Sequence, residues 1–116
     1  MIPRYRAWDK ETKTMNGMAE IYRNRNQEIE LRPRDENIIL MQSTGLRDKN
    51  GKEVFVGDVL GTKDGLLNGV VEYRTDLGMW TNSLIRYNNF ERLCNVAGNR
   101  EIIGNIYENP ELLEDE

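Results

Sequence analysis

Hydrophobic and polar residues alternate along much of the chain with a period of two, which favours strands over helices. The first such stretch is RYRAW at residues 4–8, and the polar turn DKETK follows it. Farther along, QEIELRP alternates apolar with charged residues and predicts a strand that ends at Pro33. NIILMQS, at residues 37–43, is a short apolar run and predicts a buried strand.

One early stretch, NGMAEIYRNRN, leaves two interpretations open. Met18, Ile21 and Tyr22 have helical spacing, whereas a short strand fits the same residues.

The middle of the chain, TGLRDKNGKEVFVGDVL at residues 44–60, has the most specific turn signals. Asn50-Gly51 predicts a hairpin with a type I′ turn, because both residue types tolerate a positive φ. In the strand that follows, Val54 and Val56 are predicted to point toward one face, the core. Gly57-Asp58 predicts a break before the next extended segment. Every distinctive residue here has a task in folding, which favours architecture over a chemical site.

A second hairpin is predicted in the C-terminal half. NGVVEYRT forms one strand, DLG the turn and MWTNSLIRY the returning strand. Val71 and Tyr73 share a face of the first strand, and Trp80 lies opposite them. The aromatic side chain is expected in the core.

Two short helices and one last strand complete the predicted elements. NNFERLC is a candidate helix capped by Asn88 or Asn89, and EIIGNIY is the last strand. NPELLE predicts a short helix with Asn109 as its cap and Pro110 at its first position.

The predicted fold is mainly β: a small, strongly bent sheet or an SH3-like small barrel, with an N-terminal β extension and one or two short helices. VGDVL, GVVEY and GMW are similar to the opening of SH3-like barrels, which is an analogy of fold alone. We expect an N-terminal β region at residues 1–43 and a barrel-like region with a short C-terminal helix at residues 44–116. The two are expected to form one compact unit.

Composition indicates the cytoplasm of a cell. The 116-residue chain has one cysteine, Cys94, so an internal disulfide cannot form, and a reducing compartment suits it. The first residues contain no apolar segment of the kind that a secretory signal needs. The longest apolar run, IILM, is far shorter than a membrane span.

The charge is unevenly distributed. The net charge is −4, but residues 1–34 hold eight basic and five acidic residues, whereas residues 35–116 hold eight basic and fifteen acidic. This pattern fits an ordinary solvated surface. It also fits a polar molecule whose basic end meets an acidic partner or the acidic face of a second subunit.

Few residues suggest catalysis or a cofactor. The chain has no histidine, so the commonest general base is missing, as is any Ser-His or Cys-His pair. Cys94 lies near the apolar residues Leu93 and Val96 and is expected to be buried and inert. Zinc lacks ligands, Asp48, Asn50 and Glu53 lack the spacing of a calcium loop, and GTKDGLLNG lacks the ending of a phosphate loop. We therefore expect no catalytic residue, no metal and no cofactor.

Nucleic acid is the alternative ligand. Six arginines lie in the first third of the chain, with Tyr5, Trp8 and Tyr22 between them, and such a mixture can contact phosphate and stack on bases. The net negative charge and the acids among the arginines weaken this interpretation. The candidate partner or nucleic-acid patch consists of Arg4, Arg6, Arg23, Arg25, Arg32 and Arg34.

Three blocks of the sequence together resemble the YopX family of phage and prophage proteins. They are RYRAWDKETKTM near the start, MQSTGLRDKNGKEVFVGDVL in the middle and EIIGNIYENPELLE near the end. The resemblance implies a small, largely β protein of a phage or prophage in a bacterial host. It implies no activity, because the family's function is unknown and it has no established catalytic residues.

The functional expectation is a non-enzymatic accessory protein that acts through contacts with a host or phage protein or through self-association as a homo-oligomer. The alternative is a nucleic-acid-binding accessory protein that uses the arginines of the first third. A hydrolase with a carboxylate-bound metal is a third hypothesis, and no membrane is expected as a partner.

Overall fold

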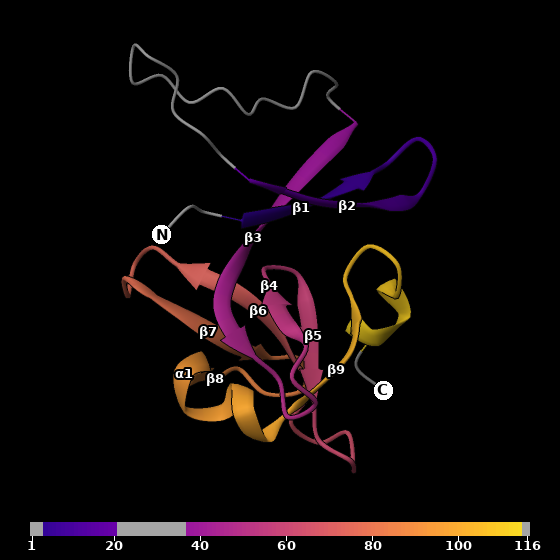
Figure 1. Ribbon diagram of the computed structural model, residues 1–116. Helices are drawn as coiled ribbons and strands as arrows, with labels where there is room; N and C mark the ends of the chain where they lie inside the picture. Colours follow the sequence, from indigo (N-terminus) through magenta and orange to yellow (C-terminus); the bar gives the residue numbers. More distant parts are fainter. Residues whose placement is uncertain (1–3, 21–36, 115–116) are drawn as a thin grey trace, which may run out of the picture. The chain divides into compact units, whose positions relative to one another are not determined.

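A computed structural model describes residues 4–20 and 37–114, except for the side chains of residues 16–20. The chain divides into two compact units, Met1–Ser43 (unit 1) and Thr44–Glu116 (unit 2). Figure 1 shows the elements. Their bounds are β1 Arg4–Asp9, β2 Thr14–Glu20, β3 Ile38–Arg47, β4 Glu53–Phe55, β5 Asp58–Gly61, β6 Gly69–Arg74, β7 Met79–Leu84, β8 Phe90–Arg92, α1 Leu93–Val96, β9 Glu101–Asn105, and the 3₁₀ helices η1 Ala97–Asn99 and η2 Pro110–Leu113.

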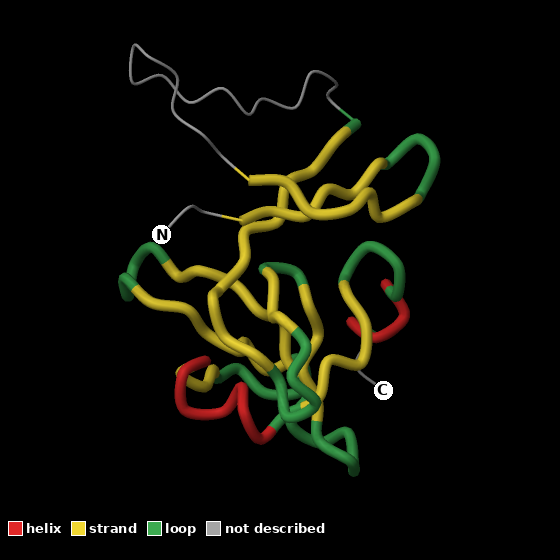
Figure 2. The backbone as a smooth tube through the Cα atoms, viewed as in Figure 1, coloured by secondary structure: helices red, strands yellow, loops and turns green. Residues whose placement is uncertain are grey.

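The prediction of a mainly β fold is confirmed. The sheet is strongly curled into a half-barrel, and one short α-helix accompanies it. Figure 2 shows how strands account for most of the path of the chain. Of the two predicted forms, a strongly bent sheet or an SH3-like small barrel, the structure has the strongly bent sheet.

In unit 1, β1 lies between β2 and the first part of β3, and both pairings are antiparallel. The turn between β1 and β2 is held by Asp9, whose Oδ1 accepts from the backbone N–H of Glu11 at 2.9 Å and of Thr12 at 3.2 Å. Among the described side chains of unit 1, Trp8 and Met41 are the buried apolar ones. The strands predicted from RYRAW and NIILMQS are thus confirmed, and the first part of the ambiguous NGMAEIYRNRN is strand. The predicted strand QEIELRP lies outside the described residues.

In unit 2, five antiparallel strands follow the order β8-β7-β6-β5-β9. The second predicted hairpin is confirmed, because β6 pairs with β7 from Gly69–Leu84 to Arg74–Met79. One cluster in the core of unit 2 contains five buried side chains, against which Leu46, Trp80 and Ile102 pack as partly buried neighbours. Trp80 therefore lies at the margin of the core, where the sequence predicted a core residue. The five core residues are Val54, Leu60, Val71, Leu93 and Ala97.

A buried aspartate organises the turn between β3 and β4. Asp48 is only 5% exposed. Its Oδ1 accepts from the backbone N–H of Asn50 at 2.8 Å and of Lys52 at 2.9 Å, and its Oδ2 accepts from Ile102 N–H at 3.0 Å. The same carboxylate thus closes the turn and holds it against β9, which lies 54 residues farther along the chain.

The turn itself differs from the prediction. Gly51 N–H donates to the carbonyl of Asp48 at 3.0 Å, and Gly51 has a φ of 83°. Among the described residues, Lys13 is the only non-glycine residue with a positive φ, so Asn50 does not adopt the left-handed conformation that a type I′ turn needs. The type I′ prediction is wrong: the left-handed residue follows the turn, as it does in three-residue hairpin loops.

The predicted helix NNFERLC is also largely wrong. Its first part is the strand β8, which pairs with Thr81–Ser83 of β7, and the helix α1 begins only at Leu93. Asn89 caps no helix, and its Oδ1 accepts from the N–H of Phe90 at 2.8 Å. Pairing with the neighbouring strand therefore overrides the local preference for a helix.

Cys94 is exposed, so the prediction of a buried thiol is wrong. The helix α1 is a single turn in which Leu93 is fully buried. Because successive helical residues point in different directions, burial of Leu93 turns Cys94 toward solvent.

The last predicted helix is a 3₁₀ turn with Pro110 in its first turn and Asn109 at its cap position. The side chain of Asn109 makes no capping hydrogen bond; its Oδ1 accepts from the N–H of Asn105 at 3.2 Å. The position of the cap is confirmed, but the side chain instead ties η2 to the end of β9.

Candidate functional site: an apolar face on the β6–β7 hairpin

The arginines proposed from the sequence are only partly within the described residues. Arg4 and Arg6 lie two positions apart on β1, so they project to the same face. The guanidinium of Arg6 donates to the sulfur of Met41 at 3.6 Å. The remaining four, Arg23, Arg25, Arg32 and Arg34, lie outside the described residues. A basic patch of these six side chains therefore stays a prediction.

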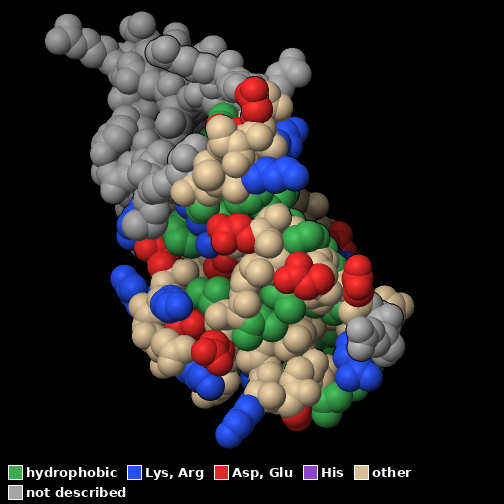
Figure 3. Space-filling model, turned by 90° about the vertical axis from the view of Figure 1, so that its right-hand side faces the viewer, with side chains coloured by type: hydrophobic (Ala, Val, Ile, Leu, Met, Phe, Trp, Pro, Cys, Tyr) green, Lys and Arg blue, Asp and Glu red, His purple; other side chains and the backbone are tan. Residues whose placement is uncertain are grey.

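Charged side chains of both signs are interspersed on the face that Figure 3 presents. Three or more histidine, cysteine or acidic side chains that could hold a metal ion do not come together anywhere in residues 4–20 and 37–114. Within these same ranges, no helix is long and apolar enough to cross a membrane.

An apolar hollow of about 400 Å³ lies in unit 2. It lies at the turn end of the β6–β7 hairpin, and we refer to it as the Trp80 hollow. Side chains from β3, β8 and α1 complete it, so residues far apart in the sequence build one surface. Its lining residues are Leu46, Tyr73, Gly78, Met79, Trp80, Arg92 and Cys94.

An aromatic pair forms the centre of this lining. Tyr73 and Trp80 lie directly opposite each other in the antiparallel register of β6 and β7. Their ring centroids are 4.9 Å apart with an interplanar angle of 70°, an edge-to-face arrangement that aromatic pairs prefer. Tyr73 is 47% exposed, whereas Trp80 is partly buried against the core. The pair thus joins the core of unit 2 to its surface.

The apolar surface continues beyond the hollow onto the turn. Leu77 is 42% exposed and follows Asp76 at the tip of the hairpin. Gly78 N–H donates to the carbonyl of Arg74 at 2.8 Å, and Leu77 N–H donates to the same oxygen at 3.1 Å. These bonds fix the turn, so Leu77 is presented by a defined backbone. Large apolar side chains gathered at one exposed place often mark a binding surface.

Among the residues that the structure describes, Arg92 is the only charged one that lines the hollow. Its side chain is exposed and has no ion pair among the described residues. Two nearby arginines, in contrast, each form an ion pair with an acid. Arg74 binds Asp76 through two bonds of 2.9 and 2.7 Å, and Arg100 binds Glu91 at 2.5 Å. The positive charge of Arg92 is therefore not paired with an acid of the described residues.

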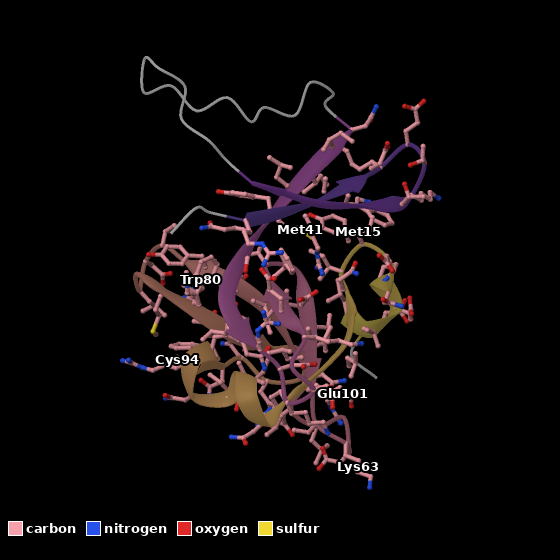
Figure 4. The ribbon with its side chains drawn as sticks, viewed as in Figure 1. Met15, Met41, Lys63, Trp80, Cys94 and Glu101 are labelled. Carbon is pink, nitrogen blue, oxygen red and sulfur yellow. The ribbon has the colours of Figure 1, made fainter. Side chains whose placement is uncertain are left out.

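Figure 4 shows where these side chains lie. Trp80 and Cys94 are on the side of unit 2 that carries β7 and α1, whereas Lys63 is at the tip of the β5–β6 loop. Lys63 is thus an exposed cation away from the hollow, which makes it a useful control position.

Two other hollows of unit 2 are polar. One lies among Glu72, Arg74, Ser83, Tyr87 and Phe90. There Glu72 accepts from the hydroxyl of Ser83 at 2.6 Å, and the Arg74 guanidinium carbon lies 5.4 Å from the centre of the Phe90 ring. Because these side chains already interact with one another, this hollow is a weaker candidate for ligand binding.

Another hollow lies between the loop before β6 and η2, and Asn68, Arg86, Glu111 and Glu114 line it. Its lining contains charges of both signs, and no metal-binding cluster forms among the described acids.

Reasoning from the sequence missed the Trp80 hollow. One signal was available: Leu77, Met79 and Trp80 flank Gly78 in a predicted turn, where polar residues are usual. The contributions of Leu46, Arg92 and Cys94 could not be foreseen, because β3, β8 and α1 approach the hairpin only in the folded chain.

Comparisons with known proteins now identify the family. The sequence pattern of the YopX protein family matches residues 4–114. The solved structure of protein EF1440 from Enterococcus faecalis is similar, with 29% identity over 98% of this chain and 99% of that one and a TM-score of 0.56. Protein yopX from Bacillus subtilis shares the fold, with 22% identity over 100% of this chain and 99% of that one and a TM-score of 0.54. Among curated proteins, none matches significantly. With the match spanning nearly its whole length, the chain belongs to the YopX protein family.

Proposed function

We propose that the protein acts by binding another protein through the Trp80 hollow and the adjoining Leu77 turn, and that it performs no catalysis. The observation that carries this proposal is the exposed aromatic and aliphatic surface at the end of the β6–β7 hairpin. Exposed Tyr73 and Leu77 lie next to partly buried Trp80 and Met79. Aromatic residues, methionine and arginine are the residue types that protein interfaces favour.

The absence of histidine from the sequence supports a binding role, because the commonest general base is missing. The biological setting we propose is the cytoplasm of a bacterial host, where the protein serves as a phage or prophage accessory protein. The bacterial sources of the two similar structures support this setting. A second copy of the chain is one candidate partner, and a host or phage protein is the other.

Site-specific crosslinking in the source bacterium tests the proposal. A photo-reactive phenylalanine analogue replaces Leu77 in one version of the full chain and Lys63 in a matched control. Both positions are exposed, but Lys63 lies away from the hollow. We expect irradiation to attach a protein to the Leu77 version and not to the Lys63 version, and the mass of the adduct distinguishes a second copy from another protein. Identical adducts at both positions, or none at Leu77, would contradict the proposal.

A further inference from the structure

Resting on that proposed function, we infer that the Trp80 hollow binds a peptide segment of a partner protein with a bulky apolar side chain next to a carboxylate. The apolar side chain packs against Trp80 and Met79 in the hollow. The carboxylate pairs with the guanidinium of Arg92. The inference thus names the chemistry of the partner, which the proposed function leaves open.

The lining requires an apolar occupant for most of its area. Leu46, Met79 and Trp80 present aliphatic, thioether and aromatic surface, and no acidic side chain of the described ranges lines the hollow. Covering such surface removes it from water, which favours binding. Methionine can also adjust its shape to the side chain that it meets.

The charge of Arg92 at the rim of the hollow favours the second feature of the bound segment, a carboxylate. Arg92 lacks an ion pair among the described residues, whereas Arg74 and Arg100 are each committed to an acid. A guanidinium forms two parallel hydrogen bonds with a carboxylate, and such bonds are stronger than those between neutral groups. Next to an apolar lining, the pair is also less screened by water. The hollow therefore distinguishes an acidic segment from a neutral or basic one.

The extent of the surface favours a peptide over a small molecule. The hollow has room for one or two side chains, and the exposed surface continues onto Tyr73 and Leu77. A small amphiphile would fill the hollow and leave the Leu77 turn uncovered. A peptide that follows the hairpin covers both.

Selection from a peptide library tests this chemistry directly. A library of random decapeptides displayed on filamentous phage is selected against the full chain, against Arg92→Gln and against the control Lys63→Gln. Both substitutions remove one exposed positive charge, but only Arg92 lines the hollow. We expect the wild-type chain and Lys63→Gln to select peptides with an acid near a bulky apolar residue. Arg92→Gln should select apolar peptides without the acid.

The best selected peptide is then synthesised with its acid and with the corresponding amide. We expect Arg92→Gln to weaken binding of the acidic peptide about tenfold and binding of the amide peptide hardly at all, as calorimetry measures for the full chain. Arg92→Lys should recover part of the loss, because it restores the charge without the planar pair of donors. Equal losses for both peptides would overturn the pairing of Arg92 with a carboxylate.

The other outcomes are equally decisive. A library that yields no binding peptide overturns the inference, as does an acid preference that Arg92→Gln leaves unchanged. Displacement of the selected peptide by decanoate at equal concentration would assign the hollow to a small amphiphile instead. If crosslinking at Leu77 captures a protein while selection shows no acid preference, the proposed function holds and the inferred chemistry fails. If selection succeeds and crosslinking captures nothing, the hollow has the inferred chemistry and the proposed function fails.

Discussion

Two turns of unit 2 have similar local chemistry and different uses. The β3–β4 turn contains Asp48 and Gly51, and the β6–β7 turn contains Asp76 and Gly78. Both glycines have a positive φ, 83° and 65°, and both donate a backbone hydrogen bond back across the turn. Asp48 is buried and accepts three backbone N–H groups. Asp76 is exposed and binds the side chain of Arg74.

The difference lies in what surrounds each turn. The β3–β4 turn lies against β9, so its carboxylate, its backbone and the N–H of Lys49 are all used within the fold. The β6–β7 turn is closed by its own residues, and its apolar side chain, Leu77, remains exposed. The exposed Leu77 side chain makes this turn the better candidate for binding. The contrast supports the proposal that Leu77 serves recognition, whereas Asp48 holds the fold together.

The largest expected effect is at Asp48. Replacing it with asparagine exchanges one carboxylate oxygen for an amide NH₂ group, which donates hydrogen bonds and cannot accept them. The one oxygen that remains cannot accept from both Ile102 and the two turn residues. A buried backbone donor loses its partner, and we expect the free energy of unfolding to fall by about 3 kcal/mol. Urea titration followed by circular dichroism measures the loss, and the Ile102 amide should exchange its hydrogen faster.

The matched control is Asp76→Asn, which removes an acid from the other turn. Its partner Arg74 is at the surface, and exposed ion pairs contribute little. We expect no measurable change in the urea midpoint. A loss equal to that of Asp48→Asn would show that the two turns contribute alike and would remove the basis of the comparison.

The acid stability of the protein should report on Asp48. Burial, the largest single influence, raises the pKa of Asp48, but the hydrogen bonds from Ile102, Lys52 and Asn50 outweigh it and lower the pKa below its ordinary value. The folded state therefore binds this proton less tightly than the unfolded state, whose aspartates have a pKa of about 3.9. The stabilisation is present above that value and is lost as the pH falls through the folded pKa.

The measurement compares the free energy of unfolding of the wild-type chain and Asp48→Asn between about pH 6 and pH 2.5. Their difference should narrow below about pH 4. Because the other acids are common to both proteins, the difference isolates Asp48. A difference that stays constant to the lowest pH would mean that the charge of Asp48 contributes no stability.

How far the sequence predicted this molecule depends on the range of the interactions. Strands β1, β6, β7 and β9 were predicted because alternation and local turn residues determine them. The helix predicted over NNFERLC failed because Phe90–Arg92 pair with β7, and this contact between chain segments outweighed the local preference. The type I′ turn failed for a similar reason, since the carboxylate of Asp48 and the approach of β9 shape that loop.

The candidate site was less predictable than the fold. The sequence pointed to arginines of the first third, of which only Arg4 and Arg6 lie within the described residues. It contained one sign of the Trp80 hollow, the apolar residues around Gly78. Cys94 shows the limit most clearly: its neighbours Leu93 and Val96 suggested burial, but the direction of a single helical turn exposes it. The direction in which a side chain of a short helix points depends on how that helix packs, and sequence patterns do not predict this packing.

The two turn glycines should respond alike to substitution. No heavy atom lies within 4 Å of a Cβ added to Gly51 or Gly78, so the cost of alanine is the left-handed backbone itself. We expect Gly51→Ala and Gly78→Ala each to lower the free energy of unfolding by about 1 kcal/mol. Gly98→Ala is the control, because that position has open space and no positive φ. A much larger loss at one turn would show that its backbone is held by more than the local bonds.

The smallest expected effect on stability is at the exposed tip of the hairpin. Leu77→Ser removes apolar surface that is 42% exposed, and we expect the free energy of unfolding to change by less than about 0.5 kcal/mol. The same change should weaken binding of the selected peptide, because Leu77 extends the proposed binding surface. Urea titration and calorimetry on one preparation measure both effects. A loss of stability above about 1 kcal/mol, with peptide binding unchanged, would place Leu77 among the residues that hold the fold and would leave the β6–β7 turn without a role in recognition.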